Sequence, residues 1–431
     1  SPSAAACGAG ARGVVFPGTE VEPQVAVDPR DPRHLVAVWQ QDRWSNGGAR
    51  GIGAAASRDG GRTWTRSTPP IGRCAGAPAA ADYERASDPW VTFAGDGVVH
   101  LDALVFDVTT ARNAMVATRS RDGVAWSAPV ALIADDDADV FNDKNAITAD
   151  PTDPGRIYAV WDRVTGVSRP TEPIGTGPVV LARATDGAWE PARPIFDPGV
   201  DQQTIGNVIA VLPDGTVIDA FTRIANASAP APQSTIEVIR SADHGVTWSA
   251  PIRVAALRTA GVREPVSERR VRTGAALPEL AVDRRTGALY LAWEAELDRE
   301  VDAIVLARST DGGLTWSAPA RVNGEPEVAA FTPGLAVAPD GTIGVSYFDL
   351  RDASGGFRAW AWLATSADGG QTWHDEPTGG SFALAPALLV ETYFLGDYQG
   401  LAATAAGFVP VFVGATPWET DHTDVFARPL D

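Results

Sequence analysis

The sequence predicts an all-β protein, a seven-bladed β-propeller built from small four-stranded sheets. Two observations predict it: a turn phrase that recurs along the chain and ends in tryptophan, and a pair of short apolar strands before each copy. Self-similarity at a period of roughly sixty residues indicates an array of repeated units or a propeller. The composition agrees, because 45% hydrophobic residues with 43 Gly, 33 Pro and 14 Trp suit short strands joined by tight turns.

The turn phrase is an Asp-Gly turn that runs directly into a tryptophan. Its full copies are SRDGGRTW (57–64), SADHGVTW (241–248), STDGGLTW (309–316) and SADGGQTW (366–373), and shorter copies end at Trp126 and Trp189. The carboxylate accepts backbone N–H groups, glycine takes positive φ, and the tryptophan packs at the start of the next strand. We therefore interpret the aspartates of the phrase as turn formers: Asp59, Asp122, Asp186, Asp243, Asp311 and Asp368.

A pair of apolar strands ending in an aromatic residue precedes each turn phrase. The copies occupy 23–39, 89–106, 145–161, 207–221, 278–293 and 333–348, with a weaker seventh at 399–412. A third strand follows each pair, and the fourth begins at the tryptophan. The seventh unit stops at its third strand, DVFARPL from Asp424, so we expect residues 13–16 to supply the fourth strand and close the ring. Six blades are the alternative.

The bulk properties bound the domain organisation and the partners. A chain of 431 residues exceeds the roughly 250 to 300 residues that one hydrophobic core supports, but each propeller blade packs only on its neighbours. We expect one domain over 1–431, with 1–12 as an N-terminal arm, and a monomer. The net charge of −19 argues against nucleic acid or an anionic membrane as partner. No apolar run reaches the roughly 18 residues needed to span a bilayer.

The two cysteines, Cys7 and Cys74, lack CxxC spacing, which argues against a metal site or a redox pair. We expect a single disulfide that pins the N-terminal arm, as in secreted proteins. The opening SPSAAACGAG is typical of the small-residue stub left after signal-peptide removal, so we expect secretion. No cofactor is firmly predicted, and a structural calcium ion stays open.

The candidate site lies on the face of the ring where chains enter the first strand and leave the second strand of each unit. Binding sites lie on loops held by a rigid scaffold, here around the axis. Most residues at these positions are carboxylates with arginines beside them, and clustered carboxylates perturb one another's pKa, which suits acid–base catalysis. We predict catalytic roles for Asp88, Asp107, Asp162, Glu294, Asp349 and Tyr398. We predict substrate-binding roles for Glu22, Gln40, Asp42, Arg43, Lys144, Arg163, Arg223, Arg351, Tyr393 and Asp397, with Glu391 from the same loop as Tyr393.

Histidines fall elsewhere, and of the five only His422 is expected to reach this face. A Ser-His-Asp triad or a histidine metal site is therefore not predicted, and carboxylates with a tyrosine are the equipment of glycoside hydrolysis. Trp44 and Trp418 lie in loops on this face and are candidate sugar platforms. The alternative is structural: polar residues at a wet channel mouth are then only solvated or form salt bridges between blades.

The turn phrase resembles the Asp-box, or BNR, repeat of the sialidase-like superfamily, and its six copies cover nearly the whole chain. The resemblance implies a glycan-active enzyme, a sialidase-like glycoside hydrolase. Members bind the substrate carboxylate with three arginines, use a Tyr–Glu pair as nucleophile and keep an Asp as acid/base. By resemblance the arginines would be Arg43, Arg223 and Arg351, with Arg163 as a substitute. The nucleophile would be Tyr393 or Tyr398, paired with Glu294 or Glu279.

The chain departs from that family in two ways. The FRIP-type motif of the first arginine is missing, since FTRIA at Phe221 sits in another blade, and sialidases have six blades. Two other functions therefore stay open. One is a polysaccharide lyase with Tyr398 as base and Arg351 as the neutralising cation. The other is a non-catalytic carbohydrate- or protein-binding propeller.

Overall fold

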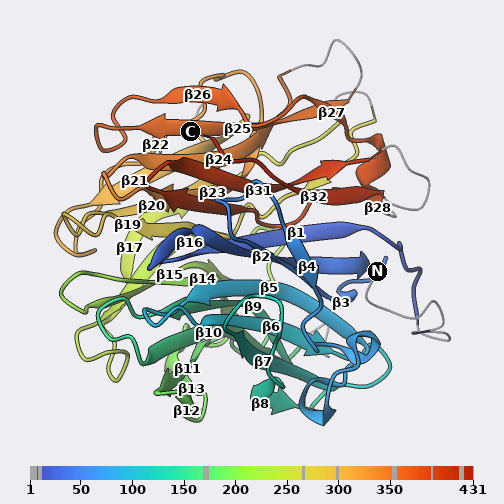
Figure 1. Cartoon of the computed structure of the whole chain (residues 1–431). Coiled ribbons are helices and arrows are strands. Elements are labelled where there is room, and N and C mark those ends of the chain that lie inside the picture. Colours follow the sequence, from blue (N-terminus) through green and yellow to red (C-terminus); the bar gives the residue numbers. More distant parts are fainter. Residues whose placement is uncertain are drawn as a thin grey trace.

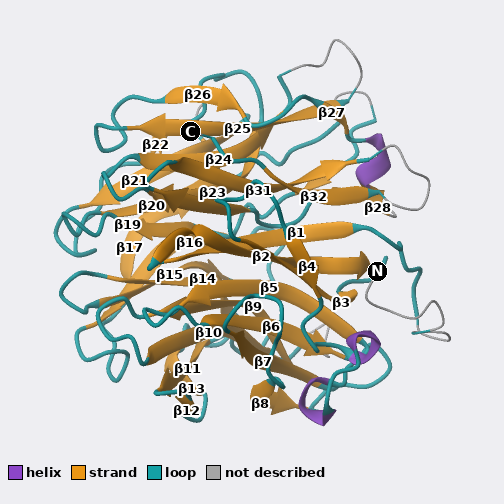
Figure 2. Ribbon diagram, in the orientation of Figure 1, coloured by secondary structure: helices purple, strands orange, loops and turns teal. Residues whose placement is uncertain are grey.

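The computed structural model describes residues 7, 12–167, 174–264, 267–297, 300–351, 357–389, 392–416 and 422–430. Over these ranges the chain is all-β, as predicted: it contains strands, three single-turn 3-10 helices and no α-helix (Figure 2). The helices are η1 (Arg73–Ala75), η2 (Ala79–Ala81) and η3 (Ala385–Ala387). Glu391 and Trp418, both predicted at the site, lie outside the described residues.

The strands form antiparallel units that follow one another along the chain. The first unit is β1 (Glu20–Asp28), β2 (Asp31–Arg43), β3 (Ala49–Ser57) and β4 (Thr65–Ser67); the second is β5 (Arg85–Phe93), β6 (Val99–Phe106), β7 (Asn113–Ser120) and β8 (Val130–Asp135). The third is β9 (Val140–Ala149), β10 (Arg156–Thr165) and β11 (Val179–Thr185), with β12 (Ala188–Trp189) and β13 (Arg193–Phe196) both on β11. The fourth is β14 (Gln202–Val211), β15 (Val217–Ala225), β16 (Gln233–Ser241) and β17 (Ile252–Leu257).

The later units follow the same order. The fifth is β19 (Glu279–Val282), β20 (Leu289–Glu296), β21 (Asp302–Ser309) and β22 (Ala320–Arg321). The sixth is β23 (Ala330–Val337), β24 (Ile343–Asp349), β25 (Arg358–Ser366) and β26 (His374–Pro377), with β27 (Phe382–Ala383) also on β25. The last is β30 (Gly400–Thr404), β31 (Gly407–Ala415) and β32 (Thr423–Ala427). A separate small sheet joins β18 (Val271–Arg272), β29 (Thr392–Phe394) and β28 (Leu388–Leu389).

The first strands of the units surround one cavity. This cavity of about 770 Å³ is lined by residues from β1, β5, β9, β14, β19, β23 and β30. Strand β1 also contacts β30, β31 and β32, so the first and last units lie side by side (Figure 1, blue beside dark red). The units are therefore arranged around a common centre.

Apolar side chains between neighbouring units form the core. Val36 and Val38 of β2 pack in one buried cluster with Val99 and Leu101 of β6, and the turn-phrase residue Trp126 packs against that cluster. Burying such faces between sheets supplies the main favourable term for folding. The turn tryptophan Trp126 thus packs against the core between the first two units.

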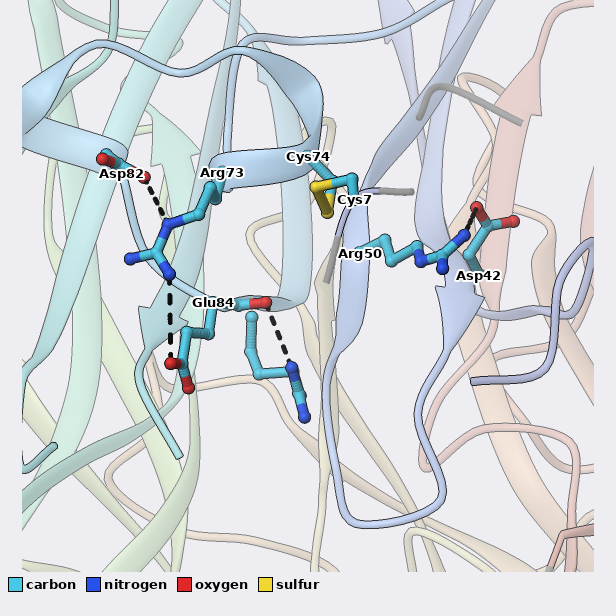
Figure 3. Close-up of a disulfide and its surroundings, with 8 residues drawn as sticks. Cys7, Asp42, Arg50, Arg73, Cys74, Asp82 and Glu84 are labelled. Atoms are coloured by element: carbon cyan, nitrogen blue, oxygen red, sulfur yellow. Dashed lines mark hydrogen bonds and ion pairs between the residues drawn. A yellow bond between two sulfur atoms is a disulfide. The ribbon is translucent and has the colours of Figure 1, made fainter. Parts of the chain in front are cut away.

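The N-terminal segment does not close the ring in the predicted way. Val15 forms an antiparallel bridge with Trp44, and Phe16 N donates to Arg43 O at 2.8 Å, so residues 13–16 pair with the first unit and not with β32. The predicted disulfide is confirmed, because Cys7 and Cys74 are bonded (Figure 3). Cys74 lies in η1, between the first two units, and this covalent link holds the arm there.

The side chain of Glu20 joins the first unit to the last. Glu20 O accepts the Thr423 hydroxyl at 2.7 Å, and Glu20 Oε2 accepts the Val425 N–H at 2.9 Å. The two units therefore meet through a carboxylate at the outer edge of β32.

Candidate functional site

The first strand carries a β-bulge at the same place in five units, where the chain enters the ring. Pairing registers shift there, and the residues at the bulge have positive φ: Glu22 (56°), Asp88 (49°), Lys144 (44°), Gly206 (71°) and Thr332 (52°). Bulges re-aim side chains and are common beside active sites. Positive φ strains any residue except glycine, and such strain gathers at functional sites. The bulges turn charged side chains toward one end of the ring.

Lys144 is the centre of the mouth cluster, which we define as Glu22, Asp88, Lys144, Arg272 and Asp397. Lys144 Nζ donates to Asp88 Oδ1 and Asp397 Oδ2, both at 2.8 Å, and lies 3.7 Å from Glu22 Oε1. Arg272 Nε donates to Asp397 Oδ1 at 2.9 Å, and Nη2 donates to its second oxygen. The Asp397 N–H donates to Glu22 Oε1 at 3.3 Å. The cluster thus joins residues from the first three units with residues of two distant loops.

Solvent reaches the mouth cluster mainly at Arg272. The side chain of Arg272 is 49% exposed, against 11% for Lys144 and 2% for Glu22. Charges that are this buried interact strongly because little water screens them. A ligand would therefore meet the arginine first and the carboxyl groups behind it.

Two long loops bring Arg272 and Asp397 to the ring. β18, in the loop between β17 and β19, pairs in parallel with β29, which precedes β30. The Phe394 ring on β29 has the guanidinium of Arg43 at 4.7 Å and that of Arg272 at 4.8 Å from its centroid. Such cation–π contacts hold the two arginines in place. Sequence reasoning missed Arg272 because it lies in a loop outside the repeat.

The mouth cluster pushes its carboxyl pKa values apart. Burial raises the pKa of Glu22 to about 7, with Lys144 opposing and Asp88 adding to the rise. Burial acts in the same direction on Asp397, but Lys144 and Arg272 outweigh it and hold its pKa well below the usual range. Burial by itself would lower the pKa of Lys144, yet Asp397 and Asp88 raise it well above the usual range. The surroundings thus favour the charged forms of Lys144 and Asp397 and the protonated form of Glu22.

A second carboxyl pair adjoins Lys144. Asp143 and Asp162 lie directly opposite each other on β9 and β10. Burial, then Asp88, raises the pKa of Asp143 to about 6, and burial, then Asp143, raises the pKa of Asp162 well above its usual range. Asp162 is 1% exposed, and its Oδ1 has no hydrogen-bond partner among the described residues. Burial and the neighbouring carboxyl group thus both favour the protonated form of this pair.

Gln40, Arg43 and Tyr398, all predicted at the site, border the mouth cluster. The Gln40 amide donates to Glu22 Oε2, and Arg43 donates to Gln40 Oε1. Tyr398 donates its hydroxyl to Pro89 O at 3.2 Å, and Lys144 Nζ lies 5.7 Å from its ring centroid. Burial, then Glu22, raises the pKa of Tyr398 well above its usual range. The tyrosine is therefore a donor at neutral pH and a poor base.

Asp42 and Trp44, both predicted at the site, are enclosed by other groups of the protein. Asp42 Oδ1 accepts the Gly18 N–H at 3.0 Å, and Oδ2 lies 3.9 Å from Arg50 (Figure 3). Trp44 is 4% exposed, and the Arg85 guanidinium lies 3.9 Å from its ring centroid. The buried, covered ring of Trp44 is not available as a sugar platform, so that prediction is wrong.

The remaining predicted residues bind partners away from the mouth cluster. These contacts are Asp107 with Arg112, Arg163 with Asp135, Arg223 with Gln202, Asp349 with Arg351, and Tyr393 with Phe357. Arg351 folds back on its own unit, with its guanidinium 3.4 Å from the Trp362 centroid. The guanidinium that shares the Phe394 ring with Arg43 is that of Arg272.

Glu294 supports a loop that carries the site. Thr273 donates its hydroxyl to Glu294 Oε1 at 3.0 Å, next to Arg272 in the chain. Burial, then Asp302, raises the pKa of Glu294 to about 8, while Asp302 accepts the N–H groups of Ala260 and Gly261 at 2.7 Å each. A protonated Glu294 thus helps fix the loop that positions Arg272.

A cavity of about 300 Å³ lies beside the mouth cluster. Lys144, Tyr398, Trp90 and Glu279 are among its lining residues. The space inside it that water-sized groups can occupy is about 20 Å³, which is enough for a water molecule. Small-molecule sites combine aromatic walls with a few polar groups in the same way. Burial raises the pKa of Glu279 to about 8. An ammonium group, a phenol and a protonated carboxyl therefore face one cavity.

The described residues contain no group of three or more His, Cys, Asp or Glu side chains arranged to hold a metal ion. Within the same ranges no helix is long and apolar enough to cross a membrane.

No family model and no curated protein matches the chain. Several solved structures match its fold. A Hadza microbial sialidase has a TM-score of 0.53 at 16% identity, with 94% of this chain and 74% of that chain covered. The α-L-arabinanase of Penicillium chrysogenum has a TM-score of 0.51 at 14% identity, with 78% and 92% covered. A polysaccharide lyase, an ulvan lyase, has a TM-score of 0.56 at 11% identity, with 96% and 95% covered.

The chain shares the fold of propeller-type enzymes. At these identities the likeness concerns architecture alone, because one fold hosts many unrelated functions. Function must therefore be argued from the mouth cluster and the cavity beside it.

Proposed function

We propose that the protein is a secreted, sialidase-like glycoside hydrolase on a seven-bladed β-propeller, with its active site at the mouth cluster. Seven blades are supported by the central cavity, which the first strands of seven units line, and by the contacts of β1 with the last unit. Secretion is supported by the Cys7–Cys74 disulfide, since such bonds persist in oxidising compartments.

The observation that carries the proposal is the divergence of two neighbouring carboxyl groups. Glu22 has a pKa of about 7, whereas Lys144 and Arg272 keep Asp397 ionised. Paired titratable groups with pKa values pushed apart mark an acid and its charged partner. Glycoside hydrolysis needs this equipment: an acid that protonates the leaving oxygen and a carboxylate for the oxocarbenium-like transition state.

In this proposal Glu22 protonates the glycosidic oxygen, and ionised Asp397 faces the positive charge that develops on the sugar ring. Lys144 orients Asp88 and Asp397 through its 2.8 Å hydrogen bonds. Arg272, half exposed at the entrance, is the cation that an acidic sugar meets first. The proposal keeps Glu22, Asp88, Lys144, Tyr398 and Asp397 from the predicted residues and adds Arg272.

The test is a screen of the purified protein against acidic and neutral glycans, followed by Glu22→Gln on any substrate that is cleaved. Loss of a general acid costs about 10²- to 10⁴-fold in kcat. Asp340→Asn is the matched control, because Asp340 lies in the turn between β23 and β24, at the opposite end of the unit. Full activity of the Glu22→Gln variant, or no cleavage of any glycan, would contradict the proposal.

A polysaccharide lyase is the second candidate. It is favoured by the likeness to the ulvan lyase over nearly the full length of both chains and by Lys144, whose Nζ lies 5.7 Å from the Tyr398 ring centroid. It requires Tyr398 to act as a base, although its hydroxyl is bonded to Pro89 O and its pKa is raised. Ultraviolet absorbance of an unsaturated product, abolished in Tyr398→Phe and kept in Glu22→Gln, would establish the lyase instead.

A non-catalytic binding propeller predicts a third outcome. Glu22→Gln and Arg272→Gln would then change glycan affinity, measured by calorimetry, and no substrate would be turned over by the unmodified protein.

A further inference from the structure

Within the part of the chain that the structure describes, the third strand of the last unit has no strand paired to its outer edge. In the other units the third strand pairs with a fourth: β3 with β4, β7 with β8, β11 with β13, β16 with β17, β21 with β22 and β25 with β26. Among the described residues β32 pairs only with β31. An unpaired strand edge offers N–H and C=O groups to another chain.

A groove runs along this open edge. It encloses about 790 Å³ and is lined by Asp424, Val425, Phe426 and Ala427 of β32, and on the far side by residues of the first unit that include Trp64. Phe426 is 45% exposed, which is unusual for a large apolar side chain in this protein. The groove is therefore open and has both apolar and charged walls, and it borders an edge of β32 that pairs with no other strand among the described residues.

The position of the groove is the one that a fourth strand occupies elsewhere. Ser67 of β4 donates to Gly123 O at 3.0 Å and accepts the Trp126 indole N–H at 3.1 Å, so the fourth strand of the first unit lies against the turn phrase of the second. Trp64 ends the turn phrase of the first unit, as Trp126 ends that of the second. The groove places this turn tryptophan opposite the edge of β32.

The third unit shows which side chain suits such a strand. Arg193 of β13 donates to the carbonyl oxygens of Gly245 and Val246 in the turn phrase of the fourth unit. The corresponding phrase of the first unit borders the groove through Trp64. The carboxylates of Glu20 and Asp424 line the groove together with the guanidinium of Arg66, which is paired with Glu20. An arginine of an added strand would therefore find its acceptors in the carbonyl oxygens of the turn phrase, as Arg193 does.

We propose that this groove binds an extended peptide of another chain as the fourth strand of the last unit. Three of the fourth strands, with the segments before them, define the peptide's chemistry: SAPIRVAAL (249–257), SAPARV (317–322) and SAPVALI (127–133). The peptide thus has a Ser-Ala-Pro start, then apolar residues alternating with an arginine. Added strands gain affinity from backbone hydrogen bonds and specificity from alternate side chains.

Glu20 occupies a hydrogen-bonding site on the edge of β32 that an added strand would need. Its carboxylate accepts the Val425 N–H, which points away from β31 and which an added strand must bond. The peptide replaces this acceptor with a carbonyl oxygen. Glu20→Ala removes the competitor, so the variant is expected to bind the peptide more tightly than the unmodified protein.

Fluorescence anisotropy with labelled SAPIRVAAL peptide and the whole protein tests the proposal. We expect saturable binding, about tenfold weaker in Phe426→Ala, which corresponds to about 1.4 kcal/mol. Leu314→Ala is the matched control, since Leu314 is 51% exposed in the turn phrase of the fifth unit, and it should bind as the unmodified protein does. A scrambled peptide with its arginine changed to glutamate should not bind.

Equal binding by Phe426→Ala, or no saturable binding to any variant, would overturn the proposal. A protein dimer in sedimentation that Phe426→Ala abolishes would also overturn it, because a second copy would then fill the groove. The glycan assays are independent of this result, since the groove shares no residue with the mouth cluster.

Discussion

Carboxyl groups at the two ends of the units have opposite surroundings. At the turn face, defined by the turn-phrase aspartates, Asp243 accepts the Thr247 N–H at 2.8 Å and hydroxyl at 2.6 Å, and the Ser241 hydroxyl at 2.8 Å. These hydrogen bonds hold the pKa of Asp243 below its usual range, and the same bonds lower that of Asp311 to about 2. Asp243 and Asp311 are thus hydrogen-bonded within their own turns, which favours their ionised forms.

The carboxyl groups of the mouth cluster are buried and share the cations Lys144 and Arg272. Burial raises the pKa of Glu22 to about 7 and that of Asp162 well above its usual range. Carboxyl groups therefore stabilise the fold at one end of the units, whereas at the other end their surroundings disfavour the ionised form. Carboxyl groups whose pKa values are raised in this way are characteristic of catalytic sites.

The largest expected effect follows removal of the central cation at the mouth. Lys144→Met leaves Asp88 and Asp397 buried without that partner and should lower the free energy of unfolding by about 3–5 kcal/mol. Arg33→Met is the counterpart at the other end of the units: the Arg33–Asp31 pair is exposed (73% and 37%), so the loss of stability should be small beside that of Lys144→Met. Urea unfolding at pH 7 measures both, and equal losses would break the contrast.

An intermediate effect of opposite sign is expected at Asp162. Its pKa is raised in the folded protein, so the stability cost is absent below the unfolded pKa of about 4 and grows as the pH rises toward the folded pKa. Asp162→Asn cannot ionise and should be more stable than the unmodified protein by about 1–3 kcal/mol at pH 8. The difference in urea midpoint should vanish near pH 4. A variant that is less stable at pH 8 would show that the carboxylate is ionised and paired.

The smallest effect is expected at the turn face. The pKa of Asp311 is lowered to about 2, so its contribution is full above the unfolded pKa and is lost as the pH falls through about 2. Asp311→Ala loses the hydrogen bonds to Thr315 and should reduce stability by about 1 kcal/mol at pH 7, since the group is exposed. Thermal unfolding at pH 7 and at pH 2 checks this. A larger loss at pH 2 would contradict the sign.

The repeat made the strands predictable from sequence, because each unit encodes its own alternation and turn. The predicted pair at 145–161 corresponds to β9 and β10, and a third strand follows at Val179 as β11. The carboxylate-rich mouth was predictable for the same reason, since equivalent positions of the repeat converge on the axis.

Contacts between distant loops left no periodic signal. Arg272 and Asp397 are 125 residues apart, and only the pairing of β18 with β29 brings them together. Likewise Asp349 and Arg351 stand at repeat positions that predict the mouth, but Trp362 and the short spacing between them favour a contact within their own unit. At these two positions the contacts within the unit decide where the side chains lie, and the repeat does not predict them. Residues 13–16 come directly after the arm that the disulfide holds, and they pair with the first unit instead of with β32.

The most direct measurement is a crystal structure of the protein with an oligosaccharide that it cleaves or binds. The contrast between the two ends predicts the sugar over Lys144 and Arg272, with its glycosidic oxygen within hydrogen-bonding distance of Glu22. A sugar seated on the turn face while Glu22 and Asp397 touch only protein would contradict it.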